Sequence, residues 1–165
     1  MTLRGSSILI IGSTGGLGSE FARQLSSQGA KLTLGSTKAD KLSNLGVSGA
    51  SAIGDITQPG IAESCVNTAL NAYGRLDGVI YAAGAVAFGP IRDYTDEVLD
   101  AVWQVNTRGW MSTLRAATPS LAASAAEGGS PFALSLSGVV AEAPTAGMGI
   151  DRAFADRAET IDTTR

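Results

Sequence analysis

A glycine-rich turn that directly follows a short apolar run constrains the fold of this chain more than any other feature. Residues 8–11 are all isoleucine or leucine, and the segment 12–18 that follows them contains four glycines. A backbone that must bend sharply, or approach a ligand closely, cannot carry a Cβ atom, which is why glycine is needed there. The pattern predicts a strand, a tight turn and the start of a helix.

Residues 17–28 are predicted to form that helix, because apolar side chains recur every four residues at Leu17, Phe21 and Leu25. The N-terminus of a helix offers unpaired N–H groups and a partial positive charge, and both favour a phosphate. We therefore interpret residues 8–28 as the pyrophosphate-binding end of a dinucleotide fold. The alternative is a glycine-rich strand-to-helix turn that binds no ligand.

Strand and helix patterns alternate along the rest of the chain. Further strands are predicted at 30–34, 50–53, 76–82 and 132–136, and helices at 39–45, at 59–73 and as two segments between 95 and 126. The nearly continuous apolar run 79–83 is typical of a strand that is covered on both faces, as in parallel sheets. The sequence therefore predicts an α/β fold of Rossmann type, with a doubly wound parallel sheet of about five strands.

Composition sets limits on the class of protein. With 165 residues, 44% hydrophobic and 16% charged, the chain suits one domain with a filled core. Its formal charge of −3 comes without basic runs, which argues against nucleic acid or an anionic membrane as a partner. No apolar run approaches the roughly 18 residues of a membrane span, and the N-terminus lacks a signal-peptide pattern. A cytoplasmic protein is expected.

The chain has a single cysteine, Cys65, and no histidine. An internal disulfide, the usual zinc site and a histidine general base are therefore excluded, and no metal is expected. Cys65 lies in a predicted amphipathic helix, so we interpret it as a small core residue, with a reactive thiol as the alternative.

Several motifs, taken in order, resemble those of the short-chain dehydrogenase/reductase family. The spacing Gly12-x-x-x-Gly16-x-Gly18 matches the phosphate loop of that family, and the matches continue to about residue 149. The resemblance implies one incomplete Rossmann domain, residues 1–149, that holds a nicotinamide dinucleotide. It implies that the loop contacts this cofactor through Gly12, Ser13, Thr14, Gly16, Leu17 and Gly18.

Two later segments resemble the parts of the family that surround the adenosine half of the cofactor. Segment 54–57 looks like the acidic turn after the third strand, although Asp55 could simply cap that turn. Segment 81–84 resembles the Asn-Asn-Ala-Gly motif after the fourth strand, with Tyr81 and Ala82 in place of both asparagines. The resemblance implies cofactor contacts from both segments, at Asp55, Ile56, Ala82, Ala83 and Gly84.

Two polar residues match catalytic positions of the family. Asn106 matches the helix asparagine that supports a proton-relay water, and the alternative is a buried polar residue satisfied by backbone. Ser137 matches the active-site serine at the end of the fifth strand, unless a different register places Gly138 there. We prefer Ser137, because glycine has no hydroxyl.

The end of the second strand bears on the choice between NAD and NADP. NAD-dependent enzymes usually place an acidic residue there, which bonds to the ribose hydroxyls and repels the 2′-phosphate of NADP. We place that position at Gly35, and no carboxylate follows before Asp40. The turn instead carries Ser36, Thr37 and Lys38. This favours NADP, held by Ser36 and Thr37, with NAD or an ordinary polar turn as alternatives.

The catalytic pair of the family is missing. The resemblance implies a tyrosine whose pKa is lowered by a lysine four residues later, on the same face of a helix. The positions four residues after the three tyrosines hold Asp77, Ala85 and Val98, and the last lysine is Lys41. Little or no turnover is therefore expected.

Beyond residue 149 the resemblance ends, and residues 150–165 form a divergent tail. This change suggests a truncated, internally deleted or frame-shifted product. Two functions stay open. One is an oxidoreductase that acts on a carbonyl or secondary alcohol with NADP or NAD. The other is a non-catalytic dinucleotide-binding or interaction module derived from that family.

The loss of the catalytic helix also bears on self-association. Without it, the fifth strand is expected to be an exposed sheet edge, which is a template for pairing with another chain. Trp110 and Met111 are candidates for an apolar surface left bare, with core burial as the alternative. A homo-oligomer formed through an exposed helix or this sheet edge is therefore a possible partner state.

Overall fold

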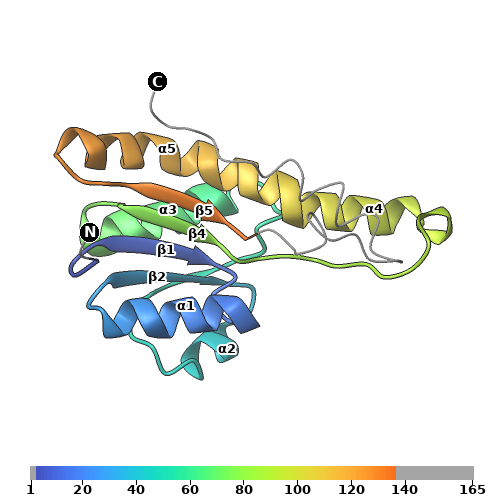
Figure 1. The fold of residues 1–165 in the computed structure, drawn as a ribbon, viewed down its shortest axis with the longest axis horizontal. Helices are drawn as coiled ribbons and strands as arrows, with labels where there is room; N and C mark the ends of the chain where they lie inside the picture. Colours follow the sequence, from blue (N-terminus) through green and yellow to red (C-terminus); the bar gives the residue numbers. More distant parts are fainter. Residues whose placement is uncertain (1–2, 137–165) are drawn as a thin grey trace.

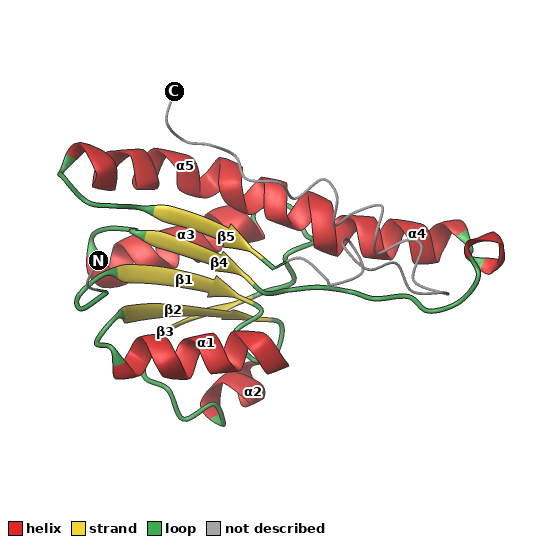
Figure 2. Cartoon of the chain, in the orientation of Figure 1, coloured by secondary structure: helices red, strands yellow, loops and turns green. Residues whose placement is uncertain are grey.

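The computed structural model describes residues 3–136, and in that part five parallel strands form one sheet between helices (Figure 1; Figure 2). The strands are β1 (Ser7–Ile11), β2 (Lys31–Ser36), β3 (Ala50–Ile53), β4 (Gly78–Tyr81) and β5 (Phe132–Ser135). The helical segments are α1 (Gly16–Ser27), α2 (Ala39–Ser43), α3 (Ile61–Tyr73), the short 3-10 helix η1 (Ile91–Asp93), α4 (Asp96–Trp103), the π-helix η2 (Gln104–Gly109) and α5 (Trp110–Ala126). The predicted α/β fold with a doubly wound parallel sheet is confirmed.

The strand order β3-β2-β1-β4-β5 reverses beside β1. The chain runs outward from β1 through β2 to β3, and then returns to place β4 and β5 on the other side of β1. In open α/β sheets, ligands bind outside the carboxyl ends of the strands at the point where the order reverses. Segment 12–18 follows β1 directly and therefore lies at that point.

The side chains of β1 alternate between two apolar layers, one on each face of the sheet. Ile8 and Ile10 belong to the layer under α1 and α2, whereas Leu9 and Ile11 belong to the layer under α3 and α5. All four side chains are at most 4% exposed. Helices cover both faces of β1, as is typical of a strand in a parallel sheet.

The face of α1 that meets the sheet differs from the predicted one. Its buried residues are Gly18, Ala22 and Leu25, whereas Leu17 is 65% exposed. The cause is the close approach of α1 at Gly18, where a Cβ atom would overlap the carbonyl oxygen of Gly12. Leu17 is thereby turned toward solvent, so its prediction as a core-facing residue is wrong.

The two helices predicted between residues 95 and 126 form one continuous helical stretch, in which η2 joins α4 to α5 (Figure 1). The flanking residues Trp103 and Trp110 keep right-handed helical dihedrals, with φ and ψ of −59° and −47° and of −60° and −51°. No turn therefore separates α4 from α5. Figure 1 shows that the α4 end of this stretch extends beyond the carboxyl edge of the sheet.

The edge strand β5 is less covered than the central strands. Within residues 3–136 it pairs with β4 alone, and Leu134 is 41% exposed. Trp110 packs on the Tyr81 ring with centroids 5.6 Å apart, which is the core alternative for that residue. Met111 is 62% exposed, so of the two only Met111 is a surface residue.

Cys65 is a core residue of α3, where it is 4% exposed and belongs to the layer on the α3 and α5 face. Burial raises the pKa of its thiol to about 11. The thiol therefore stays protonated at neutral pH, and only the thiolate is a good nucleophile. The interpretation of Cys65 as a small core residue is confirmed.

Within the part of the chain that the structure describes, no group of three or more Cys, Asp or Glu side chains is placed to hold a metal ion. No helix there is both long and apolar enough to cross a bilayer.

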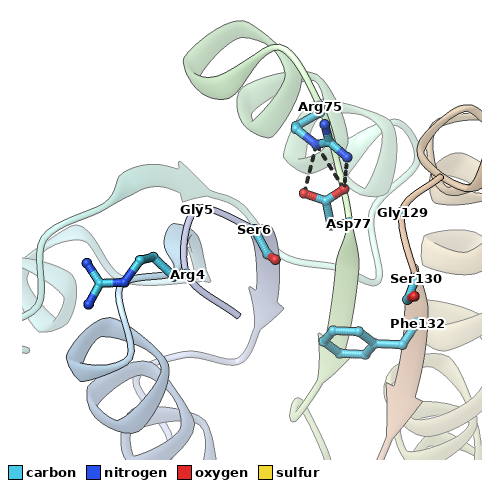
Figure 3. Close-up of a pocket in the computed structure, with 8 residues that line it drawn as sticks. All are labelled: Arg4, Gly5, Ser6, Arg75, Asp77, Gly129, Ser130 and Phe132. Atoms are coloured by element: carbon cyan, nitrogen blue, oxygen red, sulfur yellow. Dashed lines mark hydrogen bonds and ion pairs between the residues drawn. The ribbon is translucent and has the colours of Figure 1, made fainter. Parts of the chain in front are cut away.

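Asp77 organises the opposite, amino edge of the sheet (Figure 3). Its two carboxylate oxygens accept hydrogen bonds from the Ser7 amide at 2.9 Å, from the Ser124 hydroxyl at 2.6 Å and from the Arg75 guanidinium at 2.8–2.9 Å. Burial acts to raise the pKa of Asp77, but these hydrogen bonds outweigh it and hold the pKa below its usual value. A cavity of about 410 Å³ opens beside the Arg75–Asp77 pair.

We predict that Asp77→Asn lowers the free energy of unfolding at pH 7 by about 2 kcal/mol, because asparagine offers one acceptor oxygen where the carboxylate uses two. The depressed pKa of Asp77 stabilises the wild type above the unfolded-state value of about 4, and this contribution is lost as the pH falls through the folded-state value. The acid-dependent loss should therefore be smaller in the variant, as measured by urea unfolding at pH 7 and below pH 4.

The matched control is Asp93→Asn, which removes an exposed ion pair to Arg92 at 3.6 Å. We expect a change within about 0.5 kcal/mol for this variant. Equal effects of the two substitutions would contradict the structural role of Asp77.

Candidate functional site

The loop after β1 is pressed against the end of β4. Gly12 has a φ of +81°, in the left-handed region that favours glycine. A Cβ atom on Gly12 would also lie 2.6 Å from the Ala83 amide nitrogen and 2.8 Å from the Ala82 carbonyl carbon. Glycine is therefore required here both for its backbone angle and for the close approach of two backbones.

Ser13 supports this loop from behind. Its amide and its hydroxyl each donate a hydrogen bond to the Gly35 carbonyl at 3.0 Å, and its side chain is fully buried. The Gly12 amide donates to the same carbonyl at 3.0 Å. Ser13 was predicted to contact a cofactor. Both of its hydrogen-bond donors are instead directed at the Gly35 carbonyl.

The N-terminus of α1 is open to an anion. A Cβ atom on Gly16 would meet nothing within 4 Å, and the cap residue Gly15 has no side chain. The first turn of α1 carries no acidic residue that would repel a phosphate. Backbone N–H groups and the helix dipole therefore face this corner without a competing carboxylate.

The end of β2 packs closely on β1 at Gly35. Gly35 pairs with Ile11, and a Cβ atom there would lie 3.1 Å from the Ile10 carbonyl oxygen and from the Ile11 Cδ1 atom. A side chain at that point would require its neighbours to shift by a few tenths of an ångström, and the role of Gly35 as the cofactor-selective position stays a prediction. The next side chain, Ser36, faces the glycine loop instead.

Ser36 contacts the loop through its hydroxyl. The Ser36 Oγ lies 2.9 Å from the Thr14 Oγ1 and accepts a hydrogen bond from the Lys38 amide at 3.2 Å. Ser36 is 8% exposed, whereas the neighbouring Thr37 is exposed. Two of the predicted contacts, Thr14 and Ser36, are thereby brought together at the carboxyl edge.

Asp55, in the turn after β3, caps that turn. Its Oδ1 atom accepts hydrogen bonds from the Thr57 amide at 3.0 Å and from the Thr57 hydroxyl at 2.8 Å. Asp55 therefore caps its own turn, which is the alternative to a role in cofactor binding. Asp55 itself is exposed. Ile56 packs against the core layer on the α3 and α5 face. A contact from either residue to an adenine ring stays a prediction.

The segment after β4 is fixed at both ends. The Ala82 amide donates to the Ile11 carbonyl at 2.8 Å, which continues the β1–β4 pairing. Asn106 in η2 accepts a hydrogen bond from the Ala85 amide and donates one to the Ala85 carbonyl, both at 2.8 Å. The Asn106 side chain is therefore hydrogen-bonded to backbone, which is the alternative to a role in a proton relay. That role stays a prediction.

All three tyrosines of the chain lie in the described part, and each hydroxyl donates to a backbone carbonyl. The acceptors are Leu32 for Tyr73, Val105 for Tyr81 and Ala87 for Tyr94. Burial, together with the charge of Asp55, raises the pKa of Tyr81, opposite to what a catalytic tyrosine requires. Ser137 and the proposed boundary at residue 149 lie outside the described residues.

Gly109 is a residue of this region that sequence reasoning missed. A Cβ atom at this position would overlap the Tyr81 hydroxyl oxygen. The available signal was a glycine inside a predicted helix, because such a glycine usually has a packing reason.

Comparison with known proteins gives a consistent picture. The model of the family described as short chain dehydrogenase matches residues 6–147. An uncharacterized oxidoreductase of Mycobacterium tuberculosis is 39% identical over 122 residues, which is 70% of this chain and 45% of the relative. Versicolorin reductase of Emericella nidulans is 30% identical over 123 residues, which is 70% of this chain and 47% of the relative. The chain thus spans about half the length of these relatives.

Solved structures share the fold. The crystal structure of NADH-dependent reductase A1-R′ complexed with NAD matches 93% of this chain and 68% of its own, with a TM-score of 0.82 and 28% identity. A 3-ketoacyl-(acyl-carrier-protein) reductase from Brucella melitensis complexed with NADH matches 93% of this chain and 66% of its own, with a TM-score of 0.87 and 21% identity. The second match supports the fold alone.

We predict opposite outcomes for two alanine substitutions in the glycine loop. Gly18→Ala should lower the free energy of unfolding by about 1–3 kcal/mol, because the new methyl group overlaps the Gly12 carbonyl. Gly16→Ala, the matched control, enters open space at the start of a helix and should leave stability unchanged or raise it by up to about 1 kcal/mol. Chemical denaturation of both variants measures this difference, and a fully stable Gly18→Ala variant would contradict the close approach of α1.

Proposed function

The chain belongs to the short chain dehydrogenase family, and from this premise we propose that its carboxyl-edge site binds a nicotinamide dinucleotide by the diphosphate. One observation carries the proposal. The N-terminus of α1 faces the strand-order reversal with open space at Gly16 and with no acidic side chain in its first turn. A diphosphate fits this corner because its charge and acceptor oxygens complement the helix N-terminus.

In this proposal, different residues of the chain contact the two halves of the dinucleotide. Gly12 and Gly18 let the backbones of the loop, of β4 and of α1 approach one another, while Gly16 and Leu17 border the diphosphate. Asp55, Ile56, Ala82, Ala83 and Gly84 border the adenosine half. When bound, the nicotinamide ring supplies or accepts a hydride.

For the reaction, we propose a carbonyl or secondary alcohol as substrate, in keeping with the reductases among the relatives. Ser137 would orient the substrate oxygen, and Asn106 would support the proton relay. The sequence holds no Tyr-x-x-x-Lys pair, and the three tyrosine hydroxyls are bonded to carbonyls. We therefore propose that this chain turns over little or no substrate by itself.

A second candidate is a non-catalytic dinucleotide-binding or interaction module of the same descent. The absence of the tyrosine–lysine pair favours it. Self-association through the edge strand β5 or the exposed Met111 on α5 is the proposed partner state for such a module.

We propose NADP as the preferred cofactor, with NAD as the alternative. Support comes from Ser36, whose hydroxyl faces the loop where a carboxylate would repel the 2′-phosphate. Thr37 and Lys38 follow it at the same edge. The cytoplasm is the proposed compartment, in keeping with a single cysteine that has no partner for a disulfide within the chain.

We predict that Gly16→Asp weakens dinucleotide binding at least about tenfold relative to Gly16→Asn, because only the aspartate adds a charge that repels the diphosphate. Both side chains enter open space, and an acidic residue favours a helix N-terminus, so the Asp variant should be no less stable than the Asn variant. Calorimetric titration with NADPH and NADH measures both the loss and the preference between the two. Heats that are absent for the wild type with both dinucleotides would remove the binding proposal.

We also predict that the purified chain gives no steady turnover with NADPH and a panel of ketones, or with NADP and the matching secondary alcohols. The reason is that the sequence holds no Tyr-x-x-x-Lys pair to transfer the proton at the substrate oxygen. Absorbance of the reduced nicotinamide follows the reaction, and a characterised ketone reductase serves as the positive control. Robust reduction by the chain would overturn the inactive assignment while leaving the binding site in place.

A further inference from the structure

Tyr81 occupies a position where the family motif has asparagine, and it makes a contact that the phosphate loop does not explain. Its ring is 2% exposed at the end of β4 and packs on Trp110 at 5.6 Å. Its hydroxyl donates a hydrogen bond of 2.5 Å to the carbonyl of Val105 in η2. A strand residue therefore bonds directly to the backbone of the π-helix.

Gly109 provides the space for this hydroxyl. A Cβ atom on Gly109 would overlap the Tyr81 hydroxyl oxygen, whereas its next neighbours, the Gln104 carbonyl oxygen and the Ile56 Cγ2, would lie 3.3 Å away. A side chain that bonds into a helix backbone is a recognised cause of helix irregularity, and π-turns occur frequently at functional sites. Tyr81 and Gly109 are thus sterically complementary.

Asn106, the residue after Val105, holds the segment that leaves β4. It bonds to the amide and the carbonyl of Ala85 at 2.8 Å each. Residues 82–84 are therefore bracketed by the Tyr81–Val105 bond on one side and by the Asn106–Ala85 pair on the other. Two of these residues, Ala82 and Ala83, form the surface against which Gly12 is pressed.

We propose that Tyr81 is a positioning residue of the dinucleotide site: its hydroxyl, seated in the space at Gly109, holds η2 so that Asn106 clasps Ala85 and fixes residues 82–84 against the glycine loop. The consequence for binding rests on the proposed function, whereas the clasp itself does not. Burial and the nearby charge of Asp55 raise the pKa of Tyr81, so the hydroxyl remains a donor around neutral pH.

Tyr81→Phe tests the clasp by removing one oxygen while keeping the ring that packs on Trp110. In nitrogen-edited NMR spectra, the Asn106 side-chain amide and the Ala85 amide should shift, and the Ala85 amide should exchange with solvent about tenfold faster. The matched control is Tyr73→Phe, which removes a hydroxyl bonded to the Leu32 carbonyl at 2.7 Å and to the Ala50 amide at 3.1 Å, away from η2. Unchanged Asn106 and Ala85 signals in Tyr81→Phe, or equal changes in Tyr73→Phe, would overturn the proposal.

A double-mutant cycle covers the case in which Tyr81→Phe folds poorly. Gly109→Ala alone should displace the hydroxyl and give the same loss of Ala85 protection. Tyr81→Phe combined with Gly109→Ala should recover part of that loss, because the methyl group then enters the volume left by the oxygen. Additive effects of the two substitutions would contradict the complementarity of Tyr81 and Gly109.

Titration with NADPH separates this proposal from the proposed function. Binding by the wild type and at least about fivefold weaker binding by Tyr81→Phe would support both. A loosened clasp with unchanged affinity would overturn the positioning role and leave the binding site intact. No binding by the wild type would overturn the proposed function and with it the role of Tyr81 in the site, and the NMR comparison would then decide on the clasp alone.

Discussion

The packing at the carboxyl edge of the sheet depends on Gly12 and Gly18, because a Cβ atom at either position would overlap neighbouring backbone. The Gly35 carbonyl accepts hydrogen bonds from one side, the backbone of Ala82 and Ala83 closes the second side, and Gly18 of α1 closes the third. The second and third of these approaches are shorter than a Cβ atom would allow. The turn therefore meets β4 and α1 backbone to backbone, whereas the side chains of Ser13 and Thr14 add hydrogen bonds to β2.

Periodicity predicted the elements, because the spacing of apolar residues sets which face is buried. The third strand has the predicted bounds, and β4, which lies in the apolar run 79–83 apart from its first residue, is buried along its whole length as predicted. Periodicity could not show how closely a helix approaches the sheet. Leu17 fits the helical pattern but is exposed, since α1 touches the sheet at a glycine that carries no hydrophobic signal.

The same limit applies to the site. Motif spacing brought Thr14 and Ser36 to one edge of the sheet, but it did not show that Gly35 packs closely against β1 while Ser36 contacts the loop. Which side of a strand a residue faces depends on register with its neighbours, and one residue of slip reverses it. The contact between the π-helix η2 and Tyr81 was likewise invisible, because the bonded residues lie far apart in the sequence.

The Asp77 network lies at the amino edge of the sheet. It ties β1, β4 and α5 together at the end of the strands opposite the glycine turn. The two ends of β1 thus carry different contacts: the amino end is tied to β4 and α5 through Asp77, and the carboxyl end leads into the glycine loop. Substitutions at one end are therefore expected to leave the packing at the other end intact.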